Sequence, residues 1–379
     1  MKASGTKKGD FVICFAVFWY CVISLFLTLL IKMNVLSMDT QTTYRVIMTA
    51  VPMTFAIIVG VRRKPVLFLA AYLVTFFVLI LTSVIFPENQ PYIQDEGLRF
   101  LLPVCLSSAL CLMSVYDINI VYKTLIIISY LAFICAISFF VLYFLGFFSI
   151  DEYSMNFSYS CLLPMLVLYN EKKIHSIIFS ITLFLMVLAI GSRGAVLSYL
   201  GFVLYDLFSR TNKSRWWIVF MGILFVVMIP RFESFLSSID ITSRTMTMLE
   251  NDEISDDSGR SMIQQMARQL ILEHPFGLGI YGDRAKLNNA YCHNIALELM
   301  VDFGWFIGGG ICLLGFVKLL KLFKSSDKIG RCYLILMIMV GIFPFFFSGS
   351  VFQSGEPWWV LGFSVLLYKK NKHKEIMEV

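Results

Sequence analysis

Charged residues are scarce in this sequence of 379 residues. Only 15% of the residues are charged, whereas 58% are hydrophobic and the mean hydropathy is +0.78. A soluble domain carries about 25% charged residues, and it could not hide this much apolar surface. The chain is therefore expected to lie in a lipid bilayer, where apolar segments must be helices because their backbones have to satisfy their own hydrogen bonds. The predicted fold class is an all-α polytopic membrane protein.

The sequence also lacks the motifs of several function classes. It contains no Walker loop, no dinucleotide-binding fingerprint and no clear internal repeat. Nine cysteines are present, but none forms a CxxC motif or pairs with histidine at metal-ligand spacing, and only Cys292 lies in an outer loop. The others behave as small hydrophobic residues. We expect no cofactor, no metal site and no disulfide framework.

The net charge of +6 comes from short basic clusters between the apolar segments. A nucleic-acid-binding surface gathers its basic residues on one face, so we expect no nucleic-acid partner. After the lysines near the N-terminus, each cluster follows an even number of apolar segments, as the positive-inside rule predicts for cytoplasmic loops. Both termini are therefore expected in the cytoplasm. The clusters lie at residues 62–64, 123, 172–173, 210–215, 318–331 and 369–374.

About twelve membrane spans are expected, although several are shorter than the roughly 20 residues that a spanning helix needs. Nine spans fall in residues 1–230, a long polar loop occupies residues 231–302, and three spans with a basic tail occupy residues 303–379. The odd number of preceding spans places the loop outside the cell. The predicted spans are 11–31, 46–60, 65–86, 100–115, 124–148, 157–169, 174–190, 195–208, 216–230, 303–323, 332–347 and 358–368.

The long loop contains a predicted amphipathic helix. Apolar residues recur at helical spacing from residue 262 to residue 271, and Pro275 ends the pattern. Arg260, Gln264 and Arg268 recur every fourth residue, so they line the polar side of this helix. Loops of this length in a compact protein are usually functional.

Three more arginines are predicted on the outer side, against the positive-inside pattern. Arg45 and Arg99 lie at the ends of spans, where binding to lipid headgroups would account for them. Arg193 lies in the tight turn of residues 191–195, whose glycines cannot shield its charge and which has almost no other polar group. We therefore predict a functional role for Arg193.

Four short motifs together resemble the bacterial O-antigen polymerase and O-antigen ligase family of integral membrane glycan transferases. Their order and spacing match that family over about a third of the chain, and the layout of spans and long loop agrees over nearly all of it. The motifs are Ser192-Arg193-Gly194-Ala195, Gly259-Arg260, His274-Pro275-Phe276-Gly277-Leu278-Gly279, and His293-Asn294 followed by Glu298, Gly304 and Gly308.

The resemblance implies a glycan donor on a polyprenyl pyrophosphate at the outer face of the bacterial inner membrane, used without nucleotide sugar or metal. It also implies membrane lipid, a flippase and a chain-length regulator protein as partners. Arginine suits this chemistry because its planar fork matches phosphate oxygens, and histidine because it can take a proton from a sugar hydroxyl near neutral pH. The predicted catalytic residues are His293, Arg193 and Arg260, and the predicted substrate-binding residues are Arg284, Arg268, His274, Asn294 and Glu298.

Structural roles compete with several of these assignments. His293 could lock the loop through hydrogen bonds to its backbone, and His274, which precedes a proline, could cap a helix end. Asp283 and Glu298 could be simple ion-pair partners.

The predicted activity is polymerisation of lipid-linked repeat units into O-antigen or capsular polysaccharide. The alternatives are a ligase that transfers the glycan to a lipid A core, and a flippase for lipid-linked oligosaccharides. A flippase would need charged residues along its spans, whereas these spans are almost free of charge.

Overall fold

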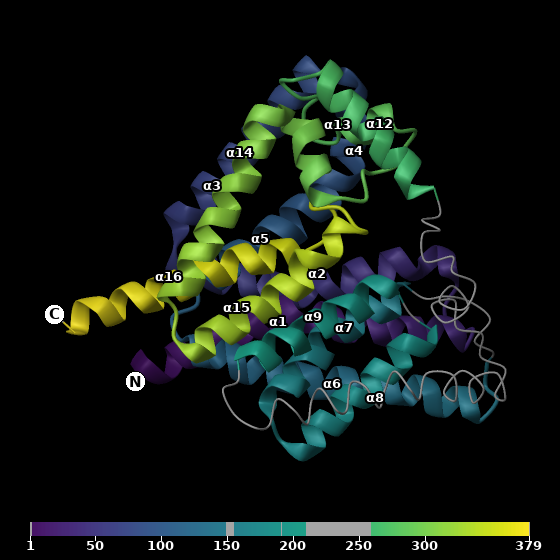
Figure 1. Cartoon of the computed structure of the whole chain (residues 1–379), viewed down its shortest axis with the longest axis vertical. Coiled ribbons are helices and arrows are strands. Elements are labelled where there is room, and N and C mark those ends of the chain that lie inside the picture. Colours follow the sequence, from purple (N-terminus) through teal and green to yellow (C-terminus); the bar gives the residue numbers. More distant parts are fainter. Residues whose placement is uncertain (1, 149–154, 191, 210–258, 379) are drawn as a thin grey trace. The chain divides into compact units, whose positions relative to one another are not determined.

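The computed structural model describes residues 2–148, 155–190, 192–209 and 259–378, and every regular element in this part is a helix (Figure 1). The all-α prediction is confirmed. Seven helices in the described part are long and apolar enough to cross a membrane, which supports a polytopic membrane protein but falls short of the expected twelve. The predicted span 216–230 lies outside the described residues. The seven are Thr6–Lys32, Thr43–Arg63, Pro65–Ile85, Pro87–Met113, Ile118–Phe144, Ile295–Ser325 and Lys328–Phe346.

The chain forms two compact units. The first comprises Met1–Val17, Thr49–Thr124 and Asp257–Val379, and the second comprises Phe18–Met48 and Leu125–Asp256. Three helices, α1 (Lys2–Lys32), α2 (Met38–Arg63) and α6 (Ile118–Phe144), contribute residues to both.

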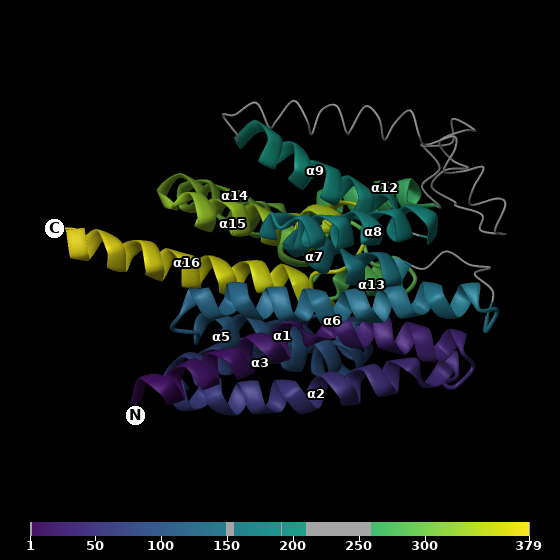
Figure 2. The same ribbon diagram turned by 90° about the horizontal axis from the view of Figure 1, so that it is seen from below.

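The second unit contains three short helices that pack side by side (Figure 2). They are α7 (Met155–Glu171), α8 (Ile174–Ile190) and α9 (Arg193–Ser209). Helix α7 is buried along most of its length and contacts both of the others. These helices match the predicted spans closely, yet each is shorter than a typical spanning helix.

The first unit holds the remaining described elements. Near one end of its long helices, short segments and loops gather around α12 and α13 (Figure 1). The elements are α3 (Pro65–Ile85), η1 (Pro87–Asn89), α4 (Gln90–Tyr92), the π-helix η2 (Ile93–Leu106), α5 (Ser107–Met113), α12 (Arg260–Glu273), α13 (Gly282–Lys286), α14 (Ile295–Ser325), α15 (Lys328–Gly341), η4 (Phe343–Phe346) and α16 (Glu356–Glu378).

Helix α14 changes direction at Gly304, whose backbone is non-helical (φ 76°, ψ 160°). Before this kink, Leu297 and Val301 are buried against α12 and the loop that follows it. After it, large apolar side chains such as Phe306 and Leu313 are exposed, as expected of a helix that contacts lipid. The predicted span began at residue 303, so it corresponds only to the part after the kink.

Candidate active site

The long loop packs against the kink of α14 at two glycines, Gly277 and Gly304. A Cβ atom at Gly277 would lie 2.4 Å from the carbonyl oxygen of Asp302, and one at Gly304 would lie 2.3 Å from that of Pro275. The backbones therefore touch where only glycine fits. Because the kink interrupts the helical hydrogen bonds, the carbonyl oxygens of Val301 and Asp302 accept hydrogen bonds from the loop amides of residues 278 and 279, at 2.9 and 2.8 Å.

Helix α12 is the amphipathic helix of the long loop. Its apolar face packs on the first segment of α14 through Ala267, which is fully buried, and through Ile263 and Leu270. The opposite face is exposed and includes Arg268. His274 is the C-cap residue of α12, and its backbone amide donates to the carbonyl oxygen of Leu270 at 2.8 Å.

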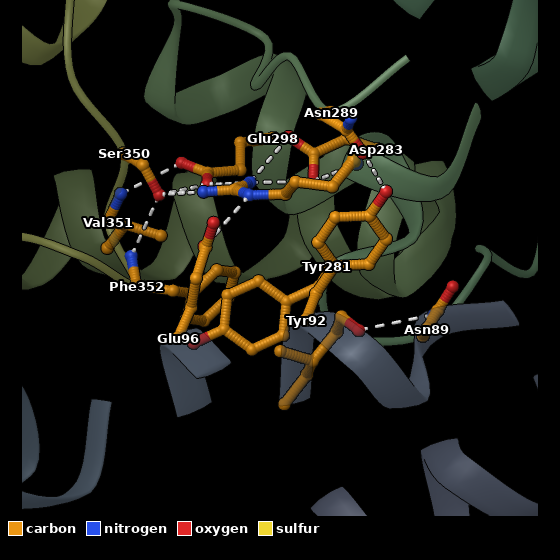
Figure 3. Close-up of polar contacts among 12 residues, drawn as sticks. Asn89, Tyr92, Glu96, Tyr281, Asp283, Asn289, Glu298, Ser350, Val351 and Phe352 are labelled. Atoms are coloured by element: carbon orange, nitrogen blue, oxygen red, sulfur yellow. Dashed lines mark hydrogen bonds and ion pairs between the residues drawn. The ribbon is translucent and has the colours of Figure 1, made fainter. Parts of the chain in front are cut away.

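Arg284 of α13 lies at the centre of an ion cluster. The carboxylates of this cluster belong to Asp283, Glu298 and Glu96 (Figure 3). The Arg284 side chain is 1% exposed, and its guanidinium nitrogens lie 2.6 Å from a carboxylate oxygen of Asp283, 2.7 Å from one of Glu298 and 3.2 Å from one of Glu96. Burial alone would lower the pKa of Arg284, but these carboxylates raise it above its ordinary value. The guanidinium therefore stays charged and is already neutralised by protein groups.

The carboxylates of this cluster also hold neighbouring segments. Glu298 accepts hydrogen bonds from the Ser350 hydroxyl and, at 2.8 Å, from the backbone amide of Val351. Asp283 accepts one from the backbone amide of Cys292 at 3.2 Å. The cluster thus ties α14 to the segment after η4 and fixes the residue that precedes His293.

Residues of η1 and α4 support the same loop from another side. The Asn89 side-chain amide donates to the carbonyl oxygens of Leu278 and Ile280 at 2.8 and 3.2 Å. Tyr92 hydrogen-bonds to the side-chain oxygen of Asn289 (Figure 3).

His293 follows the residue that this cluster holds in place. Its backbone is left-handed (φ 53°), a strained conformation for histidine, and its ring packs on Tyr291 with the centroids 4.1 Å apart. Its Nδ1 atom is buried and has no hydrogen-bond partner in the part of the chain that the structure describes. Burial and the positive charges of Arg260 and Arg284 lower the pKa of His293 to about 4. The imidazole is therefore neutral at pH 7 and can accept a proton.

Arg260 and Asn294 bind adjacent carbonyl oxygens. Arg260 donates to the oxygen of Phe347 at 3.1 Å, and the Asn294 side chain donates to that of Phe346 at 3.2 Å. Asn294 is also the N-cap of α14, since its side-chain oxygen accepts from the backbone amides of residues 296 and 297. This shared anchor places Arg260 beside the His293-Asn294 motif.

Arg193 is the first residue of α9, in the second unit. The turn before it is held against α7, because the Ser192 amide donates to the Ser158 hydroxyl at 3.0 Å. A Cβ atom at Gly194 would lie 2.4 Å from the Tyr159 hydroxyl oxygen, so the turn is closely packed. Arg193 itself is partly exposed.

Glu96 and Ser350 both contact Arg284, but neither was predicted from the sequence to belong to the site. A signal was present, because each lies in or beside a short loop that the predicted topology places on the same side of the membrane as the long loop. Among the described residues, no three histidine, cysteine, aspartate or glutamate side chains are placed to share a metal ion.

Residues 178–312 match the family model described as O-Antigen ligase. The match includes every residue that the sequence analysis singled out as catalytic or substrate-binding. No curated protein and no solved structure matches the chain.

Proposed function

Over residues 178–312 this chain belongs to the O-antigen polymerase and ligase family, and from that membership we propose that it transfers a glycan from a polyprenyl pyrophosphate to a sugar hydroxyl. The observation that carries the proposal is the imidazole of His293, whose Nδ1 atom has no partner among the described residues and whose pKa is lowered by burial and by the positive charge of Arg260. The reaction takes place at the outer face of the inner membrane, with residues 231–302 outside the cell.

His293 acts as the general base. As the acceptor hydroxyl oxygen forms a bond to the anomeric carbon of the donor, the hydroxyl proton passes to the His293 imidazole and the bond between that carbon and the phosphate oxygen breaks. A pKa of about 4 makes the free histidine a weak base. A pyrophosphate bound at Arg260 would offset the positive charge that lowers this pKa, so binding of the donor would strengthen the base.

Arg260 stabilises the pyrophosphate leaving group, and Arg193 of the second unit keeps its predicted role in binding an anion. Each is the first residue of a helix, α12 and α9 respectively, where backbone amides and the helix dipole already favour an anion. Gly259, the N-cap of α12, contributes no side-chain cap that would compete with a phosphate for the amides.

Arg284, Glu298 and Asn294 position these groups. The contacts of Arg284 and Glu298 are made with other buried protein groups, and Asn294 joins the start of α14 to the carbonyl oxygen of Phe346. We assign them to orienting His293 and Arg260 rather than to binding the sugar.

The acceptor decides between two related activities. We propose a polymerase, which joins one lipid-linked repeat unit to another. The family match supports equally the second candidate, a ligase that transfers the glycan to a lipid A core. The family match gives no support to a flippase.

Purified protein with lipid-linked repeat units as the sole substrate tests the proposal. A polymerase forms a ladder of longer lipid-linked glycans from this substrate alone. A product that appears only after lipid A core is added would identify the ligase, and no product with either acceptor would contradict glycan transfer. Reporter fusions at Lys372 and Ser255 test the orientation, because activity of a cytoplasm-only reporter at Ser255 is incompatible with an external loop.

A further inference from the structure

Two lysine side chains converge on one carbonyl oxygen at the end of α5. The ammonium groups of Lys64 and Lys369 lie 2.6 and 3.0 Å from the carbonyl oxygen of Met113, the last residue of that helix. The partial negative charge at a helix C-terminus, about half an elementary charge, cannot neutralise two ammonium groups.

The neighbouring cations differ from this pair. Arg63 is paired with Asp10, and Lys370 lies 3.0 Å from a carboxylate oxygen of Asp327. Within the described ranges, no ion pair with a carboxylate is formed by Lys64 or Lys369. The pair therefore leaves an excess of positive charge at this point.

The charge of Lys64 is unfavourable in these surroundings. Partial burial and the nearby ammonium of Lys369 lower the pKa of Lys64 to about 8. An anion between the two ammonium groups would relieve this repulsion.

The surroundings of the pair match a membrane boundary. Lys64 separates the candidate spans Thr43–Arg63 and Pro65–Ile85, and Met113 ends a third. Tyr368, directly before Lys369, is 59% exposed, as is common for tyrosine at the level of lipid headgroups. Val66 and Leu69 of α3 are 78% and 62% exposed, so an apolar surface begins beside the pair.

We propose that Lys64 and Lys369 bind the phosphate of an anionic phospholipid whose acyl chains lie along the exposed face of α3. The phosphate neutralises both ammonium groups, and Val66 and Leu69 contact the chains. A soluble phosphate would use the same charges but would leave that apolar face without a partner. This site is independent of the transfer reaction, and the predicted topology places it on the cytoplasmic side.

Native mass spectrometry of the full chain, released from detergent with added phosphatidylglycerol or phosphatidylcholine, tests the site. Wild-type protein should bind phosphatidylglycerol more tightly than phosphatidylcholine. Lys369→Gln should weaken that binding about 5-fold, and the double variant Lys64→Gln/Lys369→Gln about 30-fold, the change that corresponds to about 1 kcal/mol per basic residue. The control Lys318→Gln/Lys321→Gln removes the same charge from exposed positions on α14 and should leave the affinity unchanged.

Two results would overturn the proposal. Equal loss of affinity in the control variant would show a general charge effect rather than a site. Displacement of the lipid by glycerol phosphate at an equal concentration would show an anion site that does not use the acyl chains. If the double variant fails to fold, Lys369→Gln still decides the matter, because Lys369 is exposed.

Discussion

Two arginines of the same loop region, Arg260 and Arg284, have opposite environments. Arg284 is almost completely buried and contacts three carboxylates, whereas Arg260 is partly exposed and donates to the neutral carbonyl oxygen of Phe347. Burying a cation among carboxylates satisfies its charge within the protein and makes it part of the scaffold. A cation placed at a helix N-terminus beside a neutral acceptor keeps its capacity for an anion. The sequence alone did not separate these two roles.

The largest effect is expected for Arg284→Met. It would leave the buried carboxylates of Asp283 and Glu298 and the partly buried carboxylate of Glu96 without their cation. Breaking a buried ion pair in this way costs about 3–5 kcal/mol. Folded protein should be lost from membranes, as measured by membrane level and by size-exclusion chromatography in detergent. The control Lys286→Gln disrupts only the exposed pair with Glu88 and should have little effect. If the Arg284→Met protein reached a normal membrane level but had no activity, Arg284 would instead be assigned to substrate binding.

His293→Ala should lower transfer by about 100- to 10,000-fold while the protein remains folded, because it removes the general base. His293→Asn is the sharper variant, since asparagine tolerates the left-handed backbone but cannot act as a base near neutral pH. Polymer formation in a deletion strain, with membrane levels checked in parallel, measures both. Recovery of activity by asparagine would show that His293 only locks the loop.

Arg260→Lys and Arg193→Lys should each lower activity about 10- to 100-fold, because lysine keeps the charge but loses the planar fork. If both side chains bind one pyrophosphate, the double variant should lose less than the product of the two single losses. Arg62→Lys, at an exposed position near the end of α2, is the matched control. Fully multiplicative losses would place Arg193 and Arg260 at separate sites.

The dependence of kcat/KM on pH should reveal the charge beside His293. The base is active when deprotonated, so activity should fall only as the pH drops toward about 4, the pKa of His293. Arg260→Gln removes one of the charges that lower this pKa. In the activity that this variant retains, the decrease at acidic pH should therefore begin at a higher pH. An acid limb that is identical in both proteins would exclude His293 as the titrating group.

The smallest effect is expected for His274→Ala. His274 contributes its backbone to the end of α12, and alanine retains that contact. Activity should stay within a few-fold of wild type in the same complementation assay.

Local pattern was enough to locate α12, because apolar periodicity and Pro275 define its length. It was not enough for α14, because the predicted span of residues 303–323 covers only the part after the kink, whereas the helix begins at Ile295. Hydropathy detects the segment that contacts lipid, whereas the preceding turns carry Glu298 and Asp302, which are buried against protein. The partners of Arg284 were also hidden, since Glu96 is 188 residues away in sequence and Ser350 is 66.

The kink at Gly304 also indicates how deep α14 lies in the membrane. At 1.5 Å per residue, the straight part of α14 from Trp305 to Ser325 is about 30 Å long, which equals the thickness of the hydrocarbon layer. We therefore expect the acyl chains to end near Gly304, with the first turns of α14 among the lipid headgroups. His293 then lies at the level of the phosphates of a polyprenyl carrier. The polyprenyl chain of the donor can therefore stay in the bilayer during the reaction.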